Sequence, residues 1–206
     1  MENEWLSWAK RLEALSTTGS HFTKDPFDRE RYGEIRDIAC AMMSALGNVP
    51  LHRIDALLSD SAQGYVTPKV DVRGAIIRDE KVLLVRESSD GLWTLPGGFA
   101  DVGLSPSQNI LKEIEEEAGI LAEVIGLYSI RHKAKQPYEP DLRDFYKMFF
   151  LCRQTDERQP SARHETDAVG YFSLNDLPPL SKGRVVRADI EAAFSFRADN
   201  TGVIVD

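Results

Sequence analysis

The sequence predicts an α/β domain that follows a small all-helical domain. Three observations lead to this prediction. Apolar residues recur at helical spacing before residue 64, strand-like segments rich in β-branched and aromatic residues follow residue 68, and an amphipathic helix lies among those segments. We therefore assign residues 1–64 to the helical domain and residues 65–206 to the α/β domain.

Three helices are predicted in the first domain. The first precedes a polar break at residues 16–26, and its apolar residues at helical spacing are Trp5, Leu6, Ala9, Leu12 and Leu15. The second runs from Asp25-Pro26 to Gly47-Asn48, and its expected buried side comprises Ile35, Ile38, Ala39, Met42, Met43 and Leu46. Residues 49–58 give a short third helix, and the polar segment 59–68 is the best linker candidate.

The second domain begins with two strand-like segments, 70–77 and 81–86, whose short Asp-Glu connection predicts a hairpin. Further strands are expected at residues 122–132, 144–153 and 168–174, and a final helix at 189–198. Residues 133–143 form a long polar loop.

The central helix has clear start and stop signals. Ser105 is a good N-cap, Pro106 fits the first helical position, and Gln108 completes a capping box. Gly119 suits the left-handed position that ends a helix. One apolar stripe should pack on a sheet and consists of Ile110, Leu111, Ile114 and Ala118.

Three carboxylates lie beside that stripe. Glu113, Glu116 and Glu117 stand at positions i, i+3 and i+4, within about one turn of each other. Like charges at these spacings destabilise a bare helix by a few tenths of a kcal/mol per pair, roughly. A hard divalent cation such as Mg²⁺ offsets the repulsion because it takes oxygen ligands. Glu115 points further round and should be solvated.

Residues 97–120 resemble the Nudix box, usually written G-x5-E-x7-R-E-U-x-E-E-x-G-U, where U is a bulky aliphatic residue. Counted from Gly98, the register places Glu113, Glu116 and Glu117 on the glutamates of the E-U-x-E-E segment. Two positions depart, since Leu104 replaces the early Glu and Lys112 replaces the Arg. Lys112 should still pair with Glu116. The resemblance implies an α/β/α sandwich with a mixed sheet over about residues 66–198.

This resemblance also implies an activity, the hydrolysis of a nucleoside diphosphate linked to a group X. Mg²⁺, or Mn²⁺, would be held by the three box carboxylates, with a backbone carbonyl of Gly97 or Gly98 as a further ligand. Glu165, in the acidic loop before a late strand, is a candidate general base. Alternatively, Glu165 is an acidic residue of a surface loop and takes no part in the reaction.

The substrate-binding candidates are weaker. Phosphate recognition favours Arg, and Arg73, Arg86 and Arg131 lie in or near predicted strands, with Lys133 and Lys135 close by. Any one of them could instead be a structural ion-pair partner. Trp93 and Tyr128 could stack on a base, although an aromatic residue beside a strand usually belongs to the core.

Several other segments resemble bacterial Nudix proteins described as ADP-ribose or CDP-choline pyrophosphatases, which carry a small helical N-terminal domain. Those segments are 67–77, 83–103 and 172–181. ADP-ribose, cleaved to AMP and ribose 5-phosphate, is the first substrate candidate, and CDP-choline is the second. The rival interpretation is an inactive Nudix-fold nucleotide sensor, which Leu104 favours.

Composition restricts the partners and the location. A net charge of −8 argues against a protein that binds nucleic acid through a basic surface. No apolar run reaches transmembrane length. Cys40 and Cys152 have no metal-ligand spacing, and we expect two buried thiols in a reducing compartment, here the cytoplasm. The apolar faces of the N-terminal helices predict a homodimer contact or a pocket lid.

Overall fold

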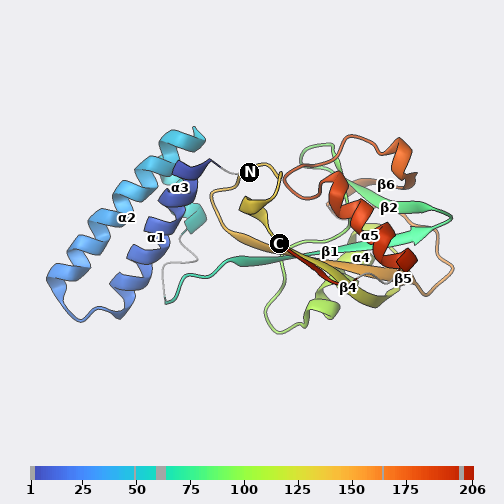
Figure 1. Ribbon diagram of the computed structural model, residues 1–206, viewed down its shortest axis with the longest axis horizontal. Coiled ribbons are helices and arrows are strands. Elements are labelled where there is room, and N and C mark those ends of the chain that lie inside the picture. The colour runs from blue at the N-terminus through green and yellow to red at the C-terminus, as the bar shows by residue number, and fades with distance from the viewer. Residues whose placement is uncertain (1–2, 49, 59–63, 164, 200–201) are drawn as a thin grey trace. The chain divides into compact units, whose positions relative to one another are not determined.

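A computed structural model describes residues 3–48, 50–58, 64–163, 165–199 and 202–206 (Figure 1). The α-helices in these residues are α1 (Glu4–Phe22), α2 (Pro26–Gly47), α3 (Leu51–Leu58), α4 (Pro106–Ala118) and α5 (Arg187–Asp199). The strands are β1 (Lys69–Arg78), β2 (Lys81–Glu87), β3 (Trp93–Thr94), β4 (Ala122–His132), β5 (Phe145–Gln154), β6 (Thr166–Ser173) and β7 (Ile204–Val205).

The chain forms two compact units. The first comprises Met1–Lys69 together with Glu139–Phe145, and the second comprises Val70–Tyr138 together with Tyr146–Asp206. Part of the expected polar loop therefore belongs to the helical unit. Residues 59–63 of the expected linker lie outside the described residues, and the boundary between residues 64 and 65 stays a prediction.

The helices of the first unit begin and end largely where the sequence predicts. The Asp25 side chain accepts the Phe27 N–H at 2.7 Å, and Asn48 ends α2 with a φ of 49°. The break expected at residues 16–26 is wrong for its first part, because α1 continues to Phe22. There Ser16 and Thr17 donate their hydroxyls to Glu13 of the same helix, at 2.8 and 2.9 Å, so they do not interrupt it.

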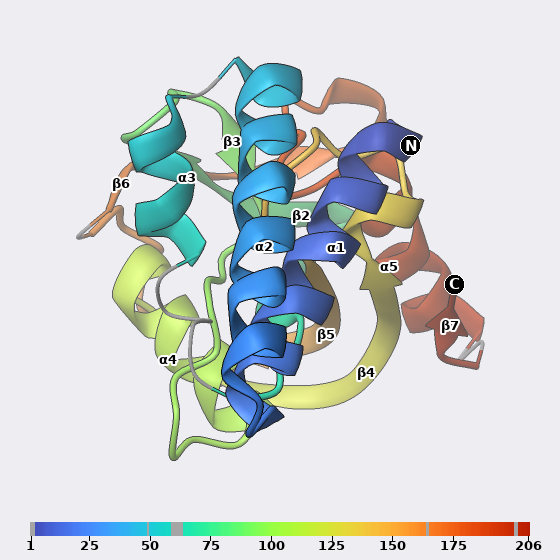
Figure 2. The same ribbon diagram turned by 90° about the vertical axis from the view of Figure 1, so that its left-hand side faces the viewer.

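The core of the helical unit is small, and α1 packs along α2 (Figure 2). Its buried residues are Leu6, Ala9, Cys40, Met43, Ile54 and Leu58. Ala39 and Met43 are buried as predicted, but Ile35, Ile38 and Leu46 are exposed, which corrects the expected buried side of α2. An exposed apolar series on α1 comprises Trp5, Trp8, Leu12 and Leu15. Three helices, of which α3 is short, do not cover all of their apolar faces with one another.

The sheet of the second unit is mixed. Its strand order is β3-β2-β1-β5-β4-β7, and β6 pairs with β2. β4 pairs with β5 in antiparallel fashion and with β7 in parallel fashion. The predicted β1–β2 hairpin is confirmed, and Asp79 and Glu80 form its turn with φ values of 50° and 55°.

Helices cover both faces of this sheet, which confirms the α/β/α sandwich. On one face α4 contributes Ile110, Ile114 and Ala118 to an apolar core, while Leu111 is only half-buried and lies outside that core. On the other face α5 contributes Ile190 and Ala193 to a second core. Cys40 and Cys152 are buried, as predicted. Among the described residues, no helix is both long enough and apolar enough to span a bilayer.

Candidate active site

The helix that carries the three carboxylates is fixed at both ends. Ser105 Oγ accepts the Gln108 N–H at 3.2 Å, and Gln108 Oε1 accepts the Ser105 N–H at 2.8 Å, so the predicted capping box is confirmed. Gly119 ends α4 in the left-handed conformation, with a φ of 71°. These two caps set which side of α4 faces the turn at Gly97 and Gly98.

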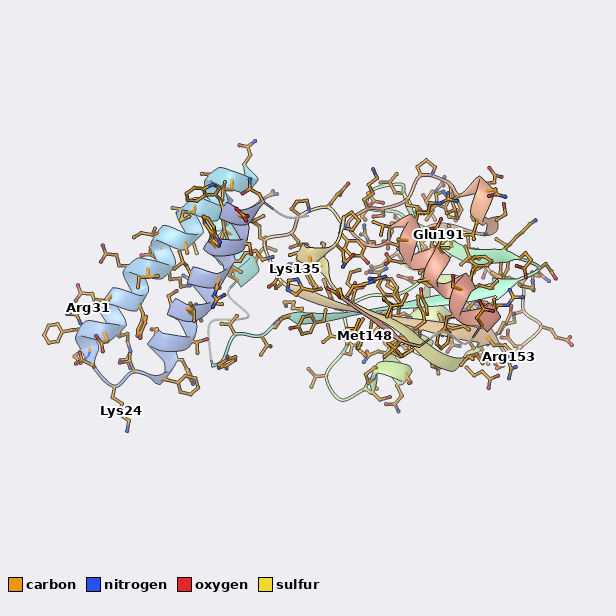
Figure 3. The ribbon with its side chains drawn as sticks, viewed as in Figure 1. Lys24, Arg31, Lys135, Met148, Arg153 and Glu191 are labelled. Atoms are coloured by element: carbon orange, nitrogen blue, oxygen red, sulfur yellow. The ribbon has the colours of Figure 1, made fainter. Side chains whose placement is uncertain are left out.

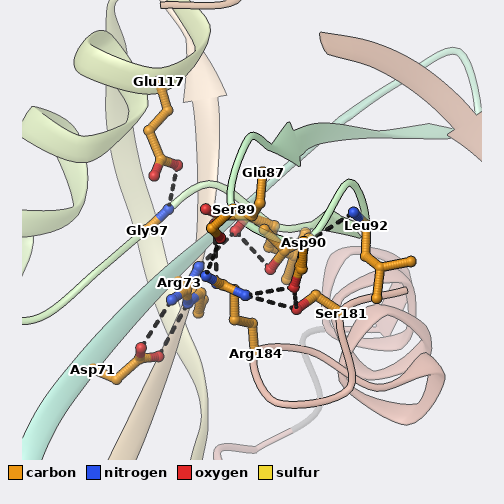
Figure 4. A network of polar contacts seen from close by, with 12 residues as sticks. Asp71, Arg73, Glu87, Ser89, Asp90, Leu92, Gly97, Glu117, Ser181 and Arg184 are labelled. Carbon is orange, nitrogen blue, oxygen red and sulfur yellow. Dashed lines mark hydrogen bonds and ion pairs between the residues drawn. The ribbon is translucent and has the colours of Figure 1, made fainter. Parts of the chain in front are cut away.

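The Gly97–Gly98 turn contacts two of the carboxylates directly. The Gly97 N–H donates to Glu117 Oε2 at 2.9 Å (Figure 4). A Cβ atom placed on Gly98 would lie 2.8 Å from Glu113 Oε1, so any larger residue would push that carboxylate away from its present position. The Gly98 carbonyl accepts the Val72 N–H at 2.8 Å, which leaves one of its two lone pairs for another donor or a cation.

Burial disfavours the charged form of two of these carboxylates. Burial raises the pKa of Glu117 to about 8, Glu87 and Glu113 add to the rise, and Arg73 and the Gly97 N–H oppose it. Burial also raises the pKa of Glu113, against the opposing charges of Lys112 and Arg73. A cation between such groups would relieve their mutual repulsion.

Glu116 has a different environment. It pairs with Lys112 at 3.0 Å, as predicted, and Lys112 also pairs with Asp101 at 3.2 Å. Glu115 is exposed, again as predicted. Within the described ranges no three carboxylate, imidazole or thiol side chains converge as a metal site. The oxygen-only donors of α4 nevertheless fit a hard divalent cation in their chemistry, and Glu116 would have to leave Lys112 to join them.

Glu165 lies near this group through its backbone. Its carbonyl accepts the Ser88 N–H at 2.9 Å, and the next residue, Thr166, donates its hydroxyl to the Glu117 carbonyl at 2.8 Å. The side chain of Glu165 is exposed, and its charge helps to raise the pKa of buried Glu87. The loop before β6 is thus attached both to α4 and to the end of β2.

Glu87 is a site residue that the sequence analysis missed. It is 5% exposed and ends β2 next to a register shift in the β2–β6 pairing. Burial raises its pKa, while Arg184, at 3.1 Å, and Arg73 oppose the rise. The sequence did contain a signal for Glu87. Leu83, Val85 and Glu87 occupy every second position of β2 and so lie on one face, and Glu87 is charged where the other two residues are apolar.

Arg73 lies inside the sheet rather than on a surface. Its guanidinium donates to Asp71 at 3.1 and 2.9 Å and to the Leu95 carbonyl at 3.2 Å, and Lys147 donates to Asp71 at 2.7 Å. Arg73 is buried, and its bond to the Leu95 carbonyl supports the segment that leads to Gly97. It also supplies a positive charge near Glu117. Burial alone would raise the pKa of Asp71, but Arg73 and Lys147 hold it at about 2.

Asp71→Asn should destabilise the protein most strongly at neutral pH. The folded-state pKa of Asp71 lies below its ordinary 3.8, so the carboxylate stabilises the fold above that pH and loses this effect as the pH falls toward about 2. We expect the variant to lose about 3 kcal/mol of unfolding free energy at pH 7, because Arg73 and Lys147 lose their partner. Urea unfolding at pH 7 and pH 3 measures this. Asp79→Asn, in the exposed hairpin turn, is the control, and an equal Asp71→Asn loss at both pH values would contradict the prediction.

The remaining substrate candidates lie elsewhere. Arg86 pairs with Asp167 at 2.6 Å, and its guanidinium lies 6.0 Å from the Trp93 ring, which packs edge-on against Phe172 at 4.7 Å. Trp93 and Phe172 border the core on the α5 face of the sheet. The structure therefore brings Arg86 and Trp93 together, beside a different core from the one to which α4 contributes.

Arg131 and Tyr128 also belong to the α5 side. Burial raises the pKa of Asp189 on α5, and the charge of Arg131 is close enough to work against that rise. The Arg131 Nε is buried and has no hydrogen-bond partner among the described residues. Tyr128 is buried between Phe149 and Phe196, which supports its core interpretation. Lys133 and Lys135 form a 3-10 turn after β4 (Figure 3).

Two known protein families match successive parts of this chain. Residues 3–58 match a family described as "UDP-X-like, N-terminal oligomerisation domain", and residues 68–194 match the NUDIX domain. A Bacillus subtilis (strain 168) protein named "Putative ADP-ribose pyrophosphatase YjhB" is 39% identical over 196 residues, which cover 95% of this chain and 93% of that protein.

Solved structures show the same relationship. The crystal structure of a UDP-X diphosphatase is 34% identical, with a TM-score of 0.64 and 98% of both chains covered. An ADP-ribose pyrophosphatase from Streptococcus suis 89-1591 is 38% identical, with a TM-score of 0.62, covering 68% of this chain and 100% of the other. The chain therefore belongs to the Nudix family and is a Nudix pyrophosphohydrolase.

Proposed function

We propose that the chain hydrolyses the pyrophosphate bond of a nucleoside diphosphate linked to X, with Mg²⁺ as its cofactor and Mn²⁺ as a substitute. The observation that carries the proposal is the contact of the Gly97–Gly98 turn with Glu117 and Glu113. ADP-ribose, which gives AMP and ribose 5-phosphate, is the first substrate, and CDP-choline is the second. Names of two relatives support ADP-ribose.

Glu113, Glu116, Glu117 and the Gly98 carbonyl would hold the cation. A bound magnesium ion supplies neutralisation of the phosphate oxygens and activation of a water molecule. The chain contributes a rigid frame, since the caps of α4 and the Gly97 N–H hold the carboxylates before substrate arrives. Glu165 is the proposed base that accepts a proton from the attacking water.

The proposed substrate contacts are Arg73, Arg86, Arg131 and Trp93. Arg131 has the strongest support of the four, because its buried Nε has no partner among the described residues and could donate to a phosphate. Arg73 would act through its charge, since its side chain is already engaged by Asp71. Arg86 and Trp93 would contact the nucleoside or X from the α5 side.

A substrate panel with and without Mg²⁺ tests the proposal. The panel contains ADP-ribose, CDP-choline and a UDP-sugar, the last because one relative is named a UDP-X diphosphatase. We expect metal-dependent release of the nucleoside monophosphate from at least one of them. Nucleotide binding without turnover across the panel would instead favour the sensor interpretation, which Leu104 in place of the early box glutamate supports.

The proposal includes a homodimer formed through the helical unit; the cytoplasmic location stays a prediction from the sequence. Trp8→Glu, in the exposed apolar series of α1, should weaken dimerisation by about thirtyfold or more, because it places a charge in a desolvated contact. Light scattering over a range of protein concentrations measures this. Ile125→Glu is the matched control, because Ile125 and Trp8 are both 49% exposed and Ile125 lies on β4. A monomeric unmodified protein would contradict the prediction.

A further inference from the structure

Arg184, between β6 and α5, holds the segment that follows β2. Its Nε pairs with Glu87 at 3.1 Å, its Nη1 donates to Asp90 at 2.8 Å, and its Nη2 donates to Ser89 at 3.1 Å (Figure 4). All three nitrogens of the guanidinium therefore have partners in one short turn. This use of the planar fork depends on Arg, because a lysine has a single nitrogen.

The same turn is secured by further bonds. Ser181 Oγ donates to Asp90 at 2.8 Å, Asp90 accepts the Leu92 N–H at 2.9 Å, and the Ser181 N–H donates to the Trp93 carbonyl at 2.8 Å. The segment thus held continues directly into Gly97 and Gly98. The Ser88 N–H of this turn also donates to the Glu165 carbonyl. The position of Arg184 therefore affects both parts of the site.

Arg184 also balances a buried charge. Glu87 is 5% exposed and lies close enough to Glu117 for its charge to act on that carboxylate. An unpaired carboxylate in such a position would add negative charge to a site that already contains Glu113 and Glu117. With Arg184 in place, that added charge is largely neutralised.

We propose that Arg184 is a positioning residue that acts through Glu87. It neutralises Glu87, so that the cation has no carboxylate ligand outside α4, and it fixes the turn on which Gly97, Gly98 and Glu165 depend. The inference rests on the proposed metal-dependent hydrolase.

Arg184→Met should change metal affinity and turnover in opposite directions. Mn²⁺ should bind about threefold to tenfold more tightly, because the positive charge of Arg184 no longer repels the cation. The kcat at saturating Mn²⁺ should fall about tenfold to a hundredfold, because the turn is no longer held in one geometry. KM for the nucleotide should change little, since the guanidinium nitrogens of Arg184 are engaged within the protein. Loss of a merely structural contact would weaken both metal binding and turnover.

Two further variants separate the charge from the geometry. In the double variant Arg184→Met with Glu87→Gln, Mn²⁺ affinity should return to that of the unmodified protein while kcat stays low. Arg184→Lys keeps the charge and loses the fork, so it should leave Mn²⁺ affinity unchanged and lower kcat. Arg187→Met is the control, because Arg187 pairs at 2.6 Å with Glu191 on the exposed side of α5, where Figure 3 labels Glu191.

The experiment measures free Mn²⁺ by electron paramagnetic resonance during titration of the full-length protein, alongside kcat and KM with the best substrate of the panel. Thermal unfolding shows whether each variant is folded. If Arg184→Met binds Mn²⁺ no more tightly than the unmodified protein, the inference is overturned and the proposed function stands. If the unmodified protein binds no Mn²⁺ and releases no monophosphate, both are overturned.

Discussion

Glu117→Gln is expected to lower kcat/KM for the best substrate by about a thousandfold or more, because it removes a charge from the centre of the metal-dependent site. The protein should remain folded. Glutamine keeps an oxygen that accepts the Gly97 N–H, and the substitution removes a negative charge that burial disfavours. Steady-state kinetics at saturating Mg²⁺ and thermal unfolding of the same sample measure the two effects.

The matched control is Glu115→Gln on the same helix. Glu115 is exposed and points away from the Gly97–Gly98 turn, so its variant should keep close to full activity. This comparison holds helix propensity and net charge constant and changes only the position of the lost carboxylate. Equal activity of the two variants would show that the reaction does not use the carboxylate beside Gly97.

Gly97→Ala is expected to lower the free energy of unfolding by about 3 kcal/mol or more, or to prevent folding. Gly97 has a φ of 143°, and a Cβ there would lie 2.0 Å from the Val72 carbonyl oxygen and 2.9 Å from the Arg73 Cα. Both atoms belong to the backbone of β1, which cannot move without breaking the sheet. Urea unfolding monitored by circular dichroism measures the loss.

Gly103→Ala separates the two causes of that effect. Gly103 also has a positive φ, 90°, but apart from its two chain neighbours no atom of the described residues lies within 4 Å of the Cβ that alanine would add. Its variant should lose only the conformational cost, about 1–2 kcal/mol. Similar losses for the two variants would mean that the close approach of β1 contributes nothing.

Local rules predicted much of the fold. Helix α4 could be placed from Ser105 to Gly119 because its cap, its apolar stripe and its stop agree with one another. The β1–β2 hairpin followed from two β-rich segments and a two-residue turn. By contrast, β3 and β7 have two residues each, too few to show an alternating pattern.

Errors in the helical unit have a physical cause. The polar residues at 16–22 indicated a break, but the hydroxyls of Ser16 and Thr17 bond within α1 and leave the helix intact. The apolar face of α2 predicted burial, yet a pattern of apolar residues shows only that a face avoids water. Which surface covers it, in the same chain or in another, depends on long-range packing that periodicity does not contain.

The carboxylates of the site could be predicted because one helix carries three of them at fixed spacing. Glu87 could be noticed as a charged residue on the apolar face of β2, but its ion pair with Arg184 could not be predicted, because Arg184 lies 97 positions away in the sequence, the difference between 184 and 87. Only the β2–β6 pairing and the segment before α5 bring the two together. The place of Arg86 and Trp93 on the α5 face likewise depends on the sheet and not on local sequence.

The discontinuous helical unit has a consequence for any attempt to isolate the catalytic part. The chain passes between the two units three times, at 69/70, 138/139 and 145/146. Lys10 pairs with Asp144 at 2.8 Å, and Leu142 packs against the helical core. A fragment cut before Val70 would keep residues 139–145 but lose the helices that cover them. The apolar side chain of Leu142, between β4 and β5, would then be exposed to water. Grafting the helices of a relative onto this enzyme would therefore require that loop to be exchanged as well.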